Sequence, residues 1–422
     1  MAEKGPETPV GPAVAGATRA QSIDTRFIRL PALHVLDWVA LGLLAVGAVC
    51  VASGALPAAA AGATIGRLLP LLLFLGSVII LAELTAAAGV FDVIAVRLSI
   101  LGRGRYPALF LLCVGLAATT TAVLNLDTTA VLLTPVLLAL AAKLRVAALP
   151  LAMTTVWLAN TASLLLPVSN LTNLLAADRV ALTPTEFAAR MWLPQLAAVS
   201  VTAFFLWVFY WRRGRRGGDT GYSLPEPHVP ADGVLFRVAA IACALFVVAI
   251  LAGVPIGPAS AVSAALVVAA FAMRTPAELR WNLIPWRLLV FVVGLFLVVD
   301  TISRHGMDTV IHALLGDQDN AAGAARAAGT GAVLSNVVNN LPAYVAGESV
   351  LPVGNQTQLL ALLVGTNVAP IVTPWASLAT LLWYERCLAA GVKVPMKRFI
   401  LTSAVLAAFA LAATVGVLLL TA

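Results

Sequence analysis

Amide and hydroxyl side chains gather in four short, proline-containing segments of an otherwise apolar sequence. The segments are NLDTTAVLLTP (125–135), LPVSNLTN (166–173), SNVVNNLP (335–342) and APIVTPWASLAT (369–380). Unpaired backbone groups at membrane depth cost several kcal/mol each unless protein groups or water satisfy them, and Pro marks where a helix breaks. Asn, Ser and Thr both donate and accept hydrogen bonds. We therefore expect two hairpin tips and two interrupted helices that meet around a polar site.

The composition excludes a soluble enzyme. Of the 422 residues 61% are hydrophobic and only 11% are charged, which indicates a polytopic membrane protein. The sequence contains no nucleophile elbow, phosphate loop or HExxH motif, so we expect no enzymatic activity and no ATP hydrolysis by the chain itself. Broken helices that meet around a polar site are typical of membrane transporters. Because the chain itself is not expected to hydrolyse ATP, transport of a solute would be driven by an ion gradient or by a partner protein. The net charge of +7 is concentrated in loops, where it reports orientation in the bilayer and not nucleic-acid binding.

The two halves of the chain contain matching segments. Residues 158–175 align without gaps with residues 365–382, and earlier in each half Glu83 matches Asp300 under a similar shift. The aligned polar pairs are Asn160 with Asn367, Asn170 with Ser377, and Asn173 with Thr380. Two blocks at similar offsets indicate a duplicated unit.

Charged loops predict that the two copies have opposite orientations. The loop with Arg97, Arg103 and Arg105 is basic, whereas its counterpart at 316–320 is acidic. Residues 178–190 are balanced in charge, whereas their counterpart carries Arg386, Lys393, Lys397 and Arg398. Basic loops lie on the cytoplasmic side, so paired loops of unlike charge lie on opposite sides. The repeats are therefore expected to be inverted.

We predict an all-α polytopic membrane protein with two inverted-topology repeats of about five elements each, whose re-entrant hairpins and interrupted helices meet at the midplane. In each repeat the third element, near 107–142 and 322–349, is either two spans or a re-entrant hairpin. The expected parts are a flexible cytoplasmic tail (1–33), a first transmembrane repeat (34–211), a basic cytoplasmic loop (212–233), a connecting transmembrane helix (234–254) and a second, inverted repeat (255–422).

Acidic residues inside the membrane are candidates for ion coupling. Asp127 lies in the first cluster and is the main candidate for carrying a proton or cation. Asp300 and Glu83 are further candidates, although either would also fit at the membrane interface, where Glu348 is expected. The clusters contain no basic residue, which favours a neutral hydroxylated solute or a small cation over a polyanion. The four cysteines lie far apart among apolar neighbours and lack the spacing of a metal site, so we interpret them as small buried hydrophobic residues. We expect neither a resident metal nor a cofactor.

At this point the sequence resembles a known family. Segments 125–140, 158–178, 335–347 and 368–383 are similar to the signature segments of arsenite efflux permeases, the arsenical pump membrane proteins of the ion transporter superfamily. The resemblance implies inverted repeats with re-entrant hairpins. It also implies export of arsenite and antimonite across a prokaryotic inner membrane in exchange for protons, sometimes with a soluble arsenite-stimulated ATPase.

Carried over residue by residue, the resemblance places a substrate site on these polar segments, next to Asp127. Its expected members are Asn125, Thr128, Thr129, Ser169, Asn170, Asn173, Asn336, Asn339, Asn340, Thr373 and Ser377. The sequence departs from the family pattern at the first tip, where Leu126 separates Asn125 from Asp127. Related branches of the superfamily exchange sodium for protons or import organic anions with sodium. The sequence leaves these two alternatives and the oligomeric state open.

Overall fold

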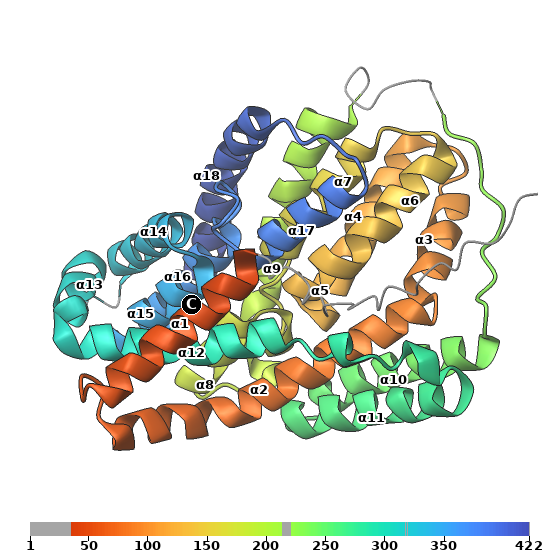
Figure 1. Cartoon of the computed structure of the whole chain (residues 1–422). Helices are drawn as coiled ribbons and strands as arrows, with labels where there is room; N and C mark the ends of the chain where they lie inside the picture. The colour runs from red at the N-terminus through yellow and green to blue at the C-terminus, as the bar shows by residue number, and fades with distance from the viewer. Residues whose placement is uncertain (1–34, 213–220, 317, 319, 422) are drawn as a thin grey trace, which may run out of the picture.

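The computed structural model describes residues 35–212, 221–316, 318 and 320–421, and its regular structure there is almost wholly helical (Figure 1). The expected N-terminal tail, residues 1–33, lies outside the described residues, as do residues 213–220 of the expected basic loop. Within the described ranges the β pairing consists of a single bridge between Arg105 and Gly221. The predicted all-α fold class is confirmed.

Five helices form a layer at the bottom of Figure 1, here called the base layer. They are α1 (Val35–Ala52), α2 (Ala58–Ala87), α10 (Gly233–Leu251), α11 (Ile256–Arg274) and α12 (Trp286–Ile302). The helix α1 packs along α12, and α11 packs along α2. A Cβ on Gly294 of α12 would collide with the backbone of Leu43 and Leu44 of α1. Small residues at such crossings let membrane helices approach closely.

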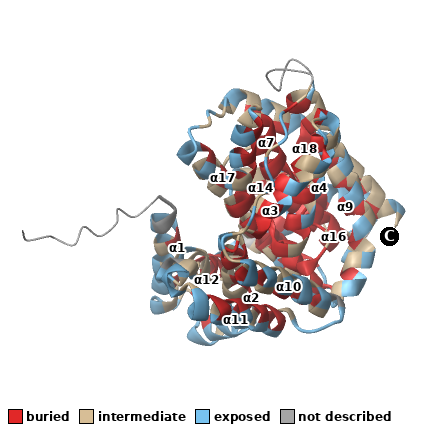
Figure 2. Cartoon of the chain, turned by 90° about the vertical axis from the view of Figure 1, so that its right-hand side faces the viewer, coloured by how far each residue is buried: buried red, intermediate tan, exposed pale blue. Residues whose placement is uncertain are grey.

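The hairpins, the interrupted helices and the final helix of each repeat form a bundle above the base layer. They are α4 (Tyr106–Leu124), α5 (Leu126–Thr128), η1 (Thr129–Leu133), α6 (Thr134–Leu144), α7 (Ala148–Thr161), α8 (Leu171–Arg179), α9 (Pro184–Leu206), α14 (Ala321–Val337), α15 (Asn340–Val350), α16 (Gln356–Val368), α17 (Leu378–Ala389) and α18 (Met396–Leu420). Figure 2 shows buried residues gathered in this bundle. Trp157 and Trp383 are fully enclosed there. The main hydrophobic core therefore lies around the interrupted helices.

Two short helices join the base layer to the bundle. They are α3 (Val90–Leu101) and α13 (Asp308–Leu315), and each follows a glycine with positive φ, Gly89 at 76° and Gly306 at 104°. Such a conformation is available to Gly at little cost, so the chain turns sharply there. Arg97 lies within α3, so the expectation that it belongs to a loop was wrong.

The same order of elements occurs twice along the chain. Two long helices, a short connector, a hairpin, an interrupted helix and a final long helix run from α1 to α9 and again from α11 to α18. Packing follows the same correspondence, because α1 on α12 is the counterpart of α11 on α2. Likewise, α4 packs on α7 in the first repeat, and α14 packs on α16 in the second. The final long helices of the two repeats, α9 and α18, pack on each other. The duplication is thus visible in the contacts, while the inverted orientation of the copies stays a prediction.

Eight helices among the described residues are long and apolar enough to cross a bilayer. They are Ala58–Ala87, Tyr106–Leu124, Leu126–Leu144, Pro184–Trp211, Gly233–Ile250, Ile256–Arg274, Trp286–Gly306 and Met396–Leu420. Large apolar side chains stand exposed on them, for example Val248 and Val262, each 61% exposed. A surface of this kind is suited to contact with lipid and not with water.

Candidate substrate site at the helix breaks

Both hairpins turn at an asparagine with positive φ. Asn125 separates α4 from α5 with φ 119°, and Asn339 precedes α15 with φ 153°. Asn adopts positive φ more readily than most residues, although such strain still costs about 1–3 kcal/mol. Each side chain also caps the helix that follows: the Asn125 amide oxygen accepts from the Thr128 N–H at 2.8 Å, and that of Asn339 accepts from the Leu341 N–H at 3.3 Å. The first and third clusters therefore form the two hairpin tips.

The second and fourth clusters form the breaks of the two interrupted helices. The first break lies between α7 and α8, and the second lies between α16 and α17. Asn170 caps α8 by accepting from the Thr172 N–H at 3.2 Å, and Ser377 caps α17 by accepting from the Thr380 N–H at 3.4 Å. These caps are equivalent positions in the repeat alignment. Each break therefore places a buried, side-chain-capped N-terminus of a half-helix inside the bundle.

The two interrupted helices are joined across the repeats. Asn367 of α16 donates to the amide oxygen of Asn173 on α8 at 2.6 Å. The equivalent pair, Asn160 of α7 and Thr380 of α17, lies at 3.4 Å. All four side chains are buried. The repeat alignment pairs these positions, but Asn160, Asn367 and Thr380 were not predicted as site residues. Their polar side chains at equivalent positions of the two repeats could have identified them.

Three polar atoms near the first tip are buried without a hydrogen-bond partner in the described structure. They belong to Asp127 (Oδ1), Thr128 (Oγ1) and Asn160 (Oδ1). The short helix α5 carries Asp127 and Thr128, and it packs against α7, which carries Asn160, and against α17. Buried polar atoms normally find a partner, so such atoms need an explanation. Two acceptors and a hydroxyl on two packed helices, α5 and α7, suit a ligand that can donate and accept hydrogen bonds.

Several other predicted site residues use their polar groups within the protein. Thr129 donates to the Asn125 carbonyl at 2.9 Å, and Ser169 donates to the Ala122 carbonyl at 2.7 Å. The Asn173 amide donates to the carbonyls of Ser163 and Leu166. These bonds fix the first hairpin and the first break in place, so they shape the site and leave little capacity for a ligand.

The second tip is tied to the second break in a similar way. Asn336 accepts from the Thr373 N–H at 3.2 Å and donates to the Ala369 carbonyl at 2.9 Å. The Thr373 hydroxyl donates back to the Asn336 carbonyl at 2.8 Å. The Asn339 amide donates to the Trp375 carbonyl, and the Asn340 N–H donates to the Ala376 carbonyl. Asn336 and Thr373 are therefore bonded to each other, and Asn339 and Asn340 are bonded to the backbone of the second break.

Asp300 and Glu83 lie on base-layer helices and are not joined to these clusters by hydrogen bonds in the described structure. Asp300 accepts from the Thr64 hydroxyl and from Arg304, each at 3.0 Å. Glu83 lies on α2, far along the helix from Thr64, the partner of Asp300. Glu348 is only 4% exposed and pairs with Arg67 at 3.0 Å, and its expected position at the membrane interface stays a prediction.

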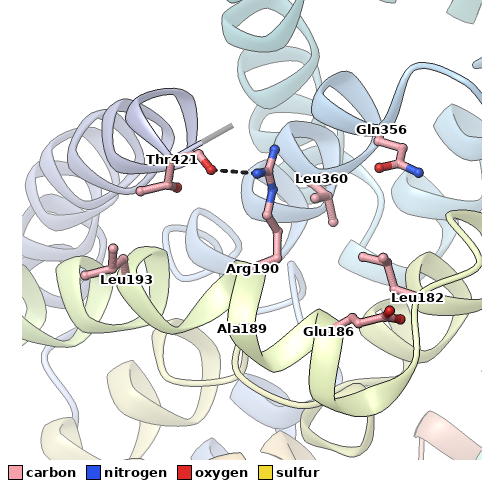
Figure 3. A pocket seen from close by; sticks show the side chains of 8 residues that line it. All are labelled: Leu182, Glu186, Ala189, Arg190, Leu193, Gln356, Leu360 and Thr421. Carbon is pink, nitrogen blue, oxygen red and sulfur yellow. Dashed lines mark hydrogen bonds between the residues drawn. The ribbon is translucent and has the colours of Figure 1, made fainter.

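The cavity in Figure 3 lies elsewhere in the bundle. It has a volume of about 430 Å³ and is lined by residues of α9 and α16, by Leu182 just before α9 and by Thr421 just after α18. Arg190 reaches across it and donates to the Thr421 carbonyl at 2.6 Å. None of the predicted site residues lines this cavity. It therefore adds no support to the substrate site at the helix breaks.

The fold and the polar helix breaks define a polytopic membrane transporter. The chain belongs to the arsenical pump membrane proteins of the ion transporter superfamily: residues 32–380 match the CitMHS family, described as citrate transporter, and curated relatives carry the arsenical pump name. It is 32% identical over 331 residues to the arsenical pump membrane protein of Yersinia enterocolitica, covering 73% of this chain and 76% of the relative. The match to its counterpart in Escherichia coli K12 is 31% over 330 residues, with the same coverage.

A solved structure has the same fold. The YdaH transporter of Alcanivorax borkumensis, described as having an unusual topology, matches with a TM-score of 0.54 over 91% of this chain and 97% of that chain. The sequence identity is 14%, so this likeness concerns the fold alone. The apolar spans and the bacterial relatives together identify a multi-pass protein of the bacterial inner membrane.

Proposed function

We propose that the chain exports arsenite and antimonite across the inner membrane in exchange for protons. The observation that carries the proposal is Asp127, an acidic side chain at a hairpin tip whose Oδ1 is buried without a partner. The Thr128 hydroxyl and the Asn160 amide oxygen are unpartnered in the same region. The names of the curated relatives support the choice of substrate.

The chemistry of arsenite suits these groups. Near neutral pH it is mainly an uncharged trihydroxide, with three hydroxyl donors and oxygen acceptors. Ionised Asp127 accepts one substrate hydroxyl, the Asn160 amide oxygen accepts another, and Thr128 both donates and accepts. A protonated Asp127 loses one acceptor and replaces it with an O–H donor. Substrate and proton therefore compete at one carboxyl group, which is the condition for exchange.

Proton entry supplies enough free energy for export. Each inward proton contributes about 2.3 kcal/mol per 100 mV, and a tenfold solute gradient costs roughly 1.4 kcal/mol. One proton per arsenite at that potential supports an arsenite concentration ratio across the membrane of about one and a half orders of magnitude. An uncharged substrate gains nothing from the membrane potential, so the proton carries the coupling.

The match to the citrate transporter family favours a second candidate, sodium-coupled import of an organic anion. The four polar clusters hold no Lys, Arg or His. A polyanion would therefore rely on half-helix N-termini and amides alone. Sodium/proton exchange is the third candidate, because Asp127 and its neighbouring oxygens also suit a small cation.

Everted membrane vesicles energised by respiration test the proposal. Arsenite and antimonite should accumulate, the accumulation should collapse with a protonophore, and removal of sodium should change nothing. Citrate uptake that requires sodium would support the second candidate instead. Sodium-driven proton movement without metalloid would support the third.

A further inference from the structure

The cavity of Figure 3 lies where three helices begin or end. Helix α9 begins at Pro184 and α16 begins at Gln356, whereas α18 ends at Leu420, so the cavity lies between the first repeat and the second. Both α9 and α18 belong to segments that are long and apolar enough to span a bilayer. The end of such a span lies at the membrane surface, where lipid headgroups meet the hydrocarbon. The cavity is therefore at the level of the headgroups.

Basic residues lie at the opposite ends of the same two spans. The span of α9 is followed by the basic sequence RRGRR at 212–216, and α18 carries Lys397 and Arg398 next to its first residue, Met396. Lys and Arg are enriched on the cytoplasmic side of a bilayer. These ends are therefore predicted to be cytoplasmic, and the cavity is predicted to face the outer leaflet of the inner membrane.

Two opposite charges line the cavity and are not paired with each other in the described structure. Glu186 and Arg190 lie four residues apart on α9, a spacing that usually favours an ion pair. The Arg190 guanidinium donates to the Thr421 carbonyl at 2.6 Å. Glu186 Oε2 accepts from the N–H and the hydroxyl of Thr183, at 2.9 and 2.7 Å. Each charged group is thus held in place by an uncharged partner.

An apolar strip continues from the cavity along α9. Leu193 lines the cavity, and Leu196 follows it by three residues on the same face of the helix, where it is 53% exposed. Trp192 is 52% exposed, and exposed Trp is typical of the membrane interface. Leu360 of α16 also lines the cavity. A ligand can therefore place a charged head in the cavity and a hydrocarbon chain along α9.

We propose that this cavity binds a phospholipid whose headgroup carries a primary ammonium, as in phosphatidylethanolamine. Arg190 binds the phosphate with its remaining N–H donors, and Glu186 accepts from the ammonium through Oε1. One acyl chain lies along Leu193 and Leu196. A purely anionic headgroup would meet the Glu186 carboxylate, and a quaternary ammonium has no N–H to donate to it. Such a site does not depend on which substrate the chain transports.

Lipid binding to the purified full chain in detergent tests the site. Native mass spectrometry measures how many lipids stay bound to the folded protein when phosphatidylethanolamine, phosphatidylglycerol or phosphatidylcholine is offered at the same concentration. Wild type should bind one phosphatidylethanolamine about tenfold more tightly than either of the other two lipids, because only this headgroup pairs with both charges. Equal affinity for all three lipids overturns the proposal.

Two variants remove one charge each and preserve the local fold. Glu186→Gln still accepts from Thr183, because Gln replaces Glu in a capping box, and it should abolish the preference for phosphatidylethanolamine over phosphatidylglycerol. Arg190→Gln keeps an amide donor near the Thr421 carbonyl and should weaken the binding of phosphatidylethanolamine about tenfold. Unchanged affinity and preference in both variants contradict the proposal.

Arg237→Gln is the matched control. Arg237 also lies near the start of a span, on α10, and it donates to the Gly233 carbonyl at 3.0 Å, away from the cavity. This variant should bind lipid as wild type does. A loss equal to that of Arg190→Gln would assign the effect to the total charge of the protein and overturn the site.

Free phosphoethanolamine distinguishes a lipid from a soluble ligand with the same charged groups. It lacks the acyl chains that Leu193 and Leu196 would contact, so it should not displace the lipid when both are present at the same concentration. Displacement under these conditions would make the cavity a site for a soluble zwitterion and would overturn a lipid as its occupant.

Discussion

Asn367 donates a 2.6 Å hydrogen bond to the amide oxygen of Asn173, and the repeat-equivalent pair, Asn160 and Thr380, is joined at 3.4 Å. Each interrupted helix is thus held at its break by the other repeat. The shorter bond is reinforced by Thr172, whose hydroxyl donates to the Asn367 amide oxygen at 2.7 Å. The two halves of the crossing are therefore equivalent in position and unequal in strength.

This inequality predicts different effects of two alanine substitutions. Asn367→Ala leaves the Asn173 amide oxygen and the Thr172 hydroxyl buried without those partners, at a cost of about 1–3 kcal/mol each. Asn160→Ala removes an amide whose oxygen is already unpartnered, so it should lower the melting temperature less. It should nevertheless weaken arsenite uptake, because that oxygen is one of the unpartnered acceptors assigned to the proposed site. Thermal unfolding in detergent and vesicle uptake measure the two effects. Equal losses of stability would contradict the distinction.

Adjacent threonines at the first tip provide a matched pair. The Thr128 hydroxyl is buried and unpartnered, whereas that of Thr129 donates to the Asn125 carbonyl and accepts from Thr121 at 3.0 Å. Thr129→Val should destabilise the protein by about 1–3 kcal/mol, because Thr121 and Asn125 lose this partner. Thr128→Val should leave stability unchanged or higher and raise the arsenite concentration needed for half-maximal transport. The opposite pattern would remove Thr128 from the proposed site.

Tyr222 anchors the segment between the repeats to the turn between α3 and α4. Its hydroxyl donates to the Ser99 carbonyl at 2.6 Å, and its ring meets Tyr106 edge-on with centroids 5.8 Å apart. Burial raises the pKa of Tyr222 above its usual value of 10.0. The folded state therefore holds this proton more tightly than the unfolded state, and the contribution is full below pH 10.0 and is lost as pH rises through the folded pKa.

Tyr222→Phe should therefore lower stability by about 0.5–1.5 kcal/mol near neutral pH, because the bond to Ser99 is lost. The difference in melting temperature between wild type and variant should shrink above about pH 10. Melting curves across that range measure it. A difference that stays constant with pH would show that the hydroxyl is not held as described.

The helix breaks were predictable from the sequence because Asn, Ser, Thr and Pro are costly in an apolar segment and so mark irregular backbone. Repeat alignment also indicated equivalent polar positions. The bonds between Asn367 and Asn173 or between Arg67 and Glu348 could not be predicted, since they join residues far apart in the chain and no local pattern encodes them. Asp300 illustrates the same limit: the repeat relates it to Glu83, but hydrogen bonds from Thr64 and Arg304 decide what its carboxylate does.

Asp127 is the centre of the account, and purified protein in proteoliposomes tests it most directly. Wild type and Asp127→Asn are compared in two assays, arsenite counterflow without any gradient and uphill arsenite movement driven by an imposed pH gradient. Asp127→Asn should retain counterflow, because the amide still offers an oxygen acceptor, and should lose uphill movement, because it cannot exchange a proton. Uphill movement at the wild-type rate in Asp127→Asn would contradict Asp127 as the proton carrier.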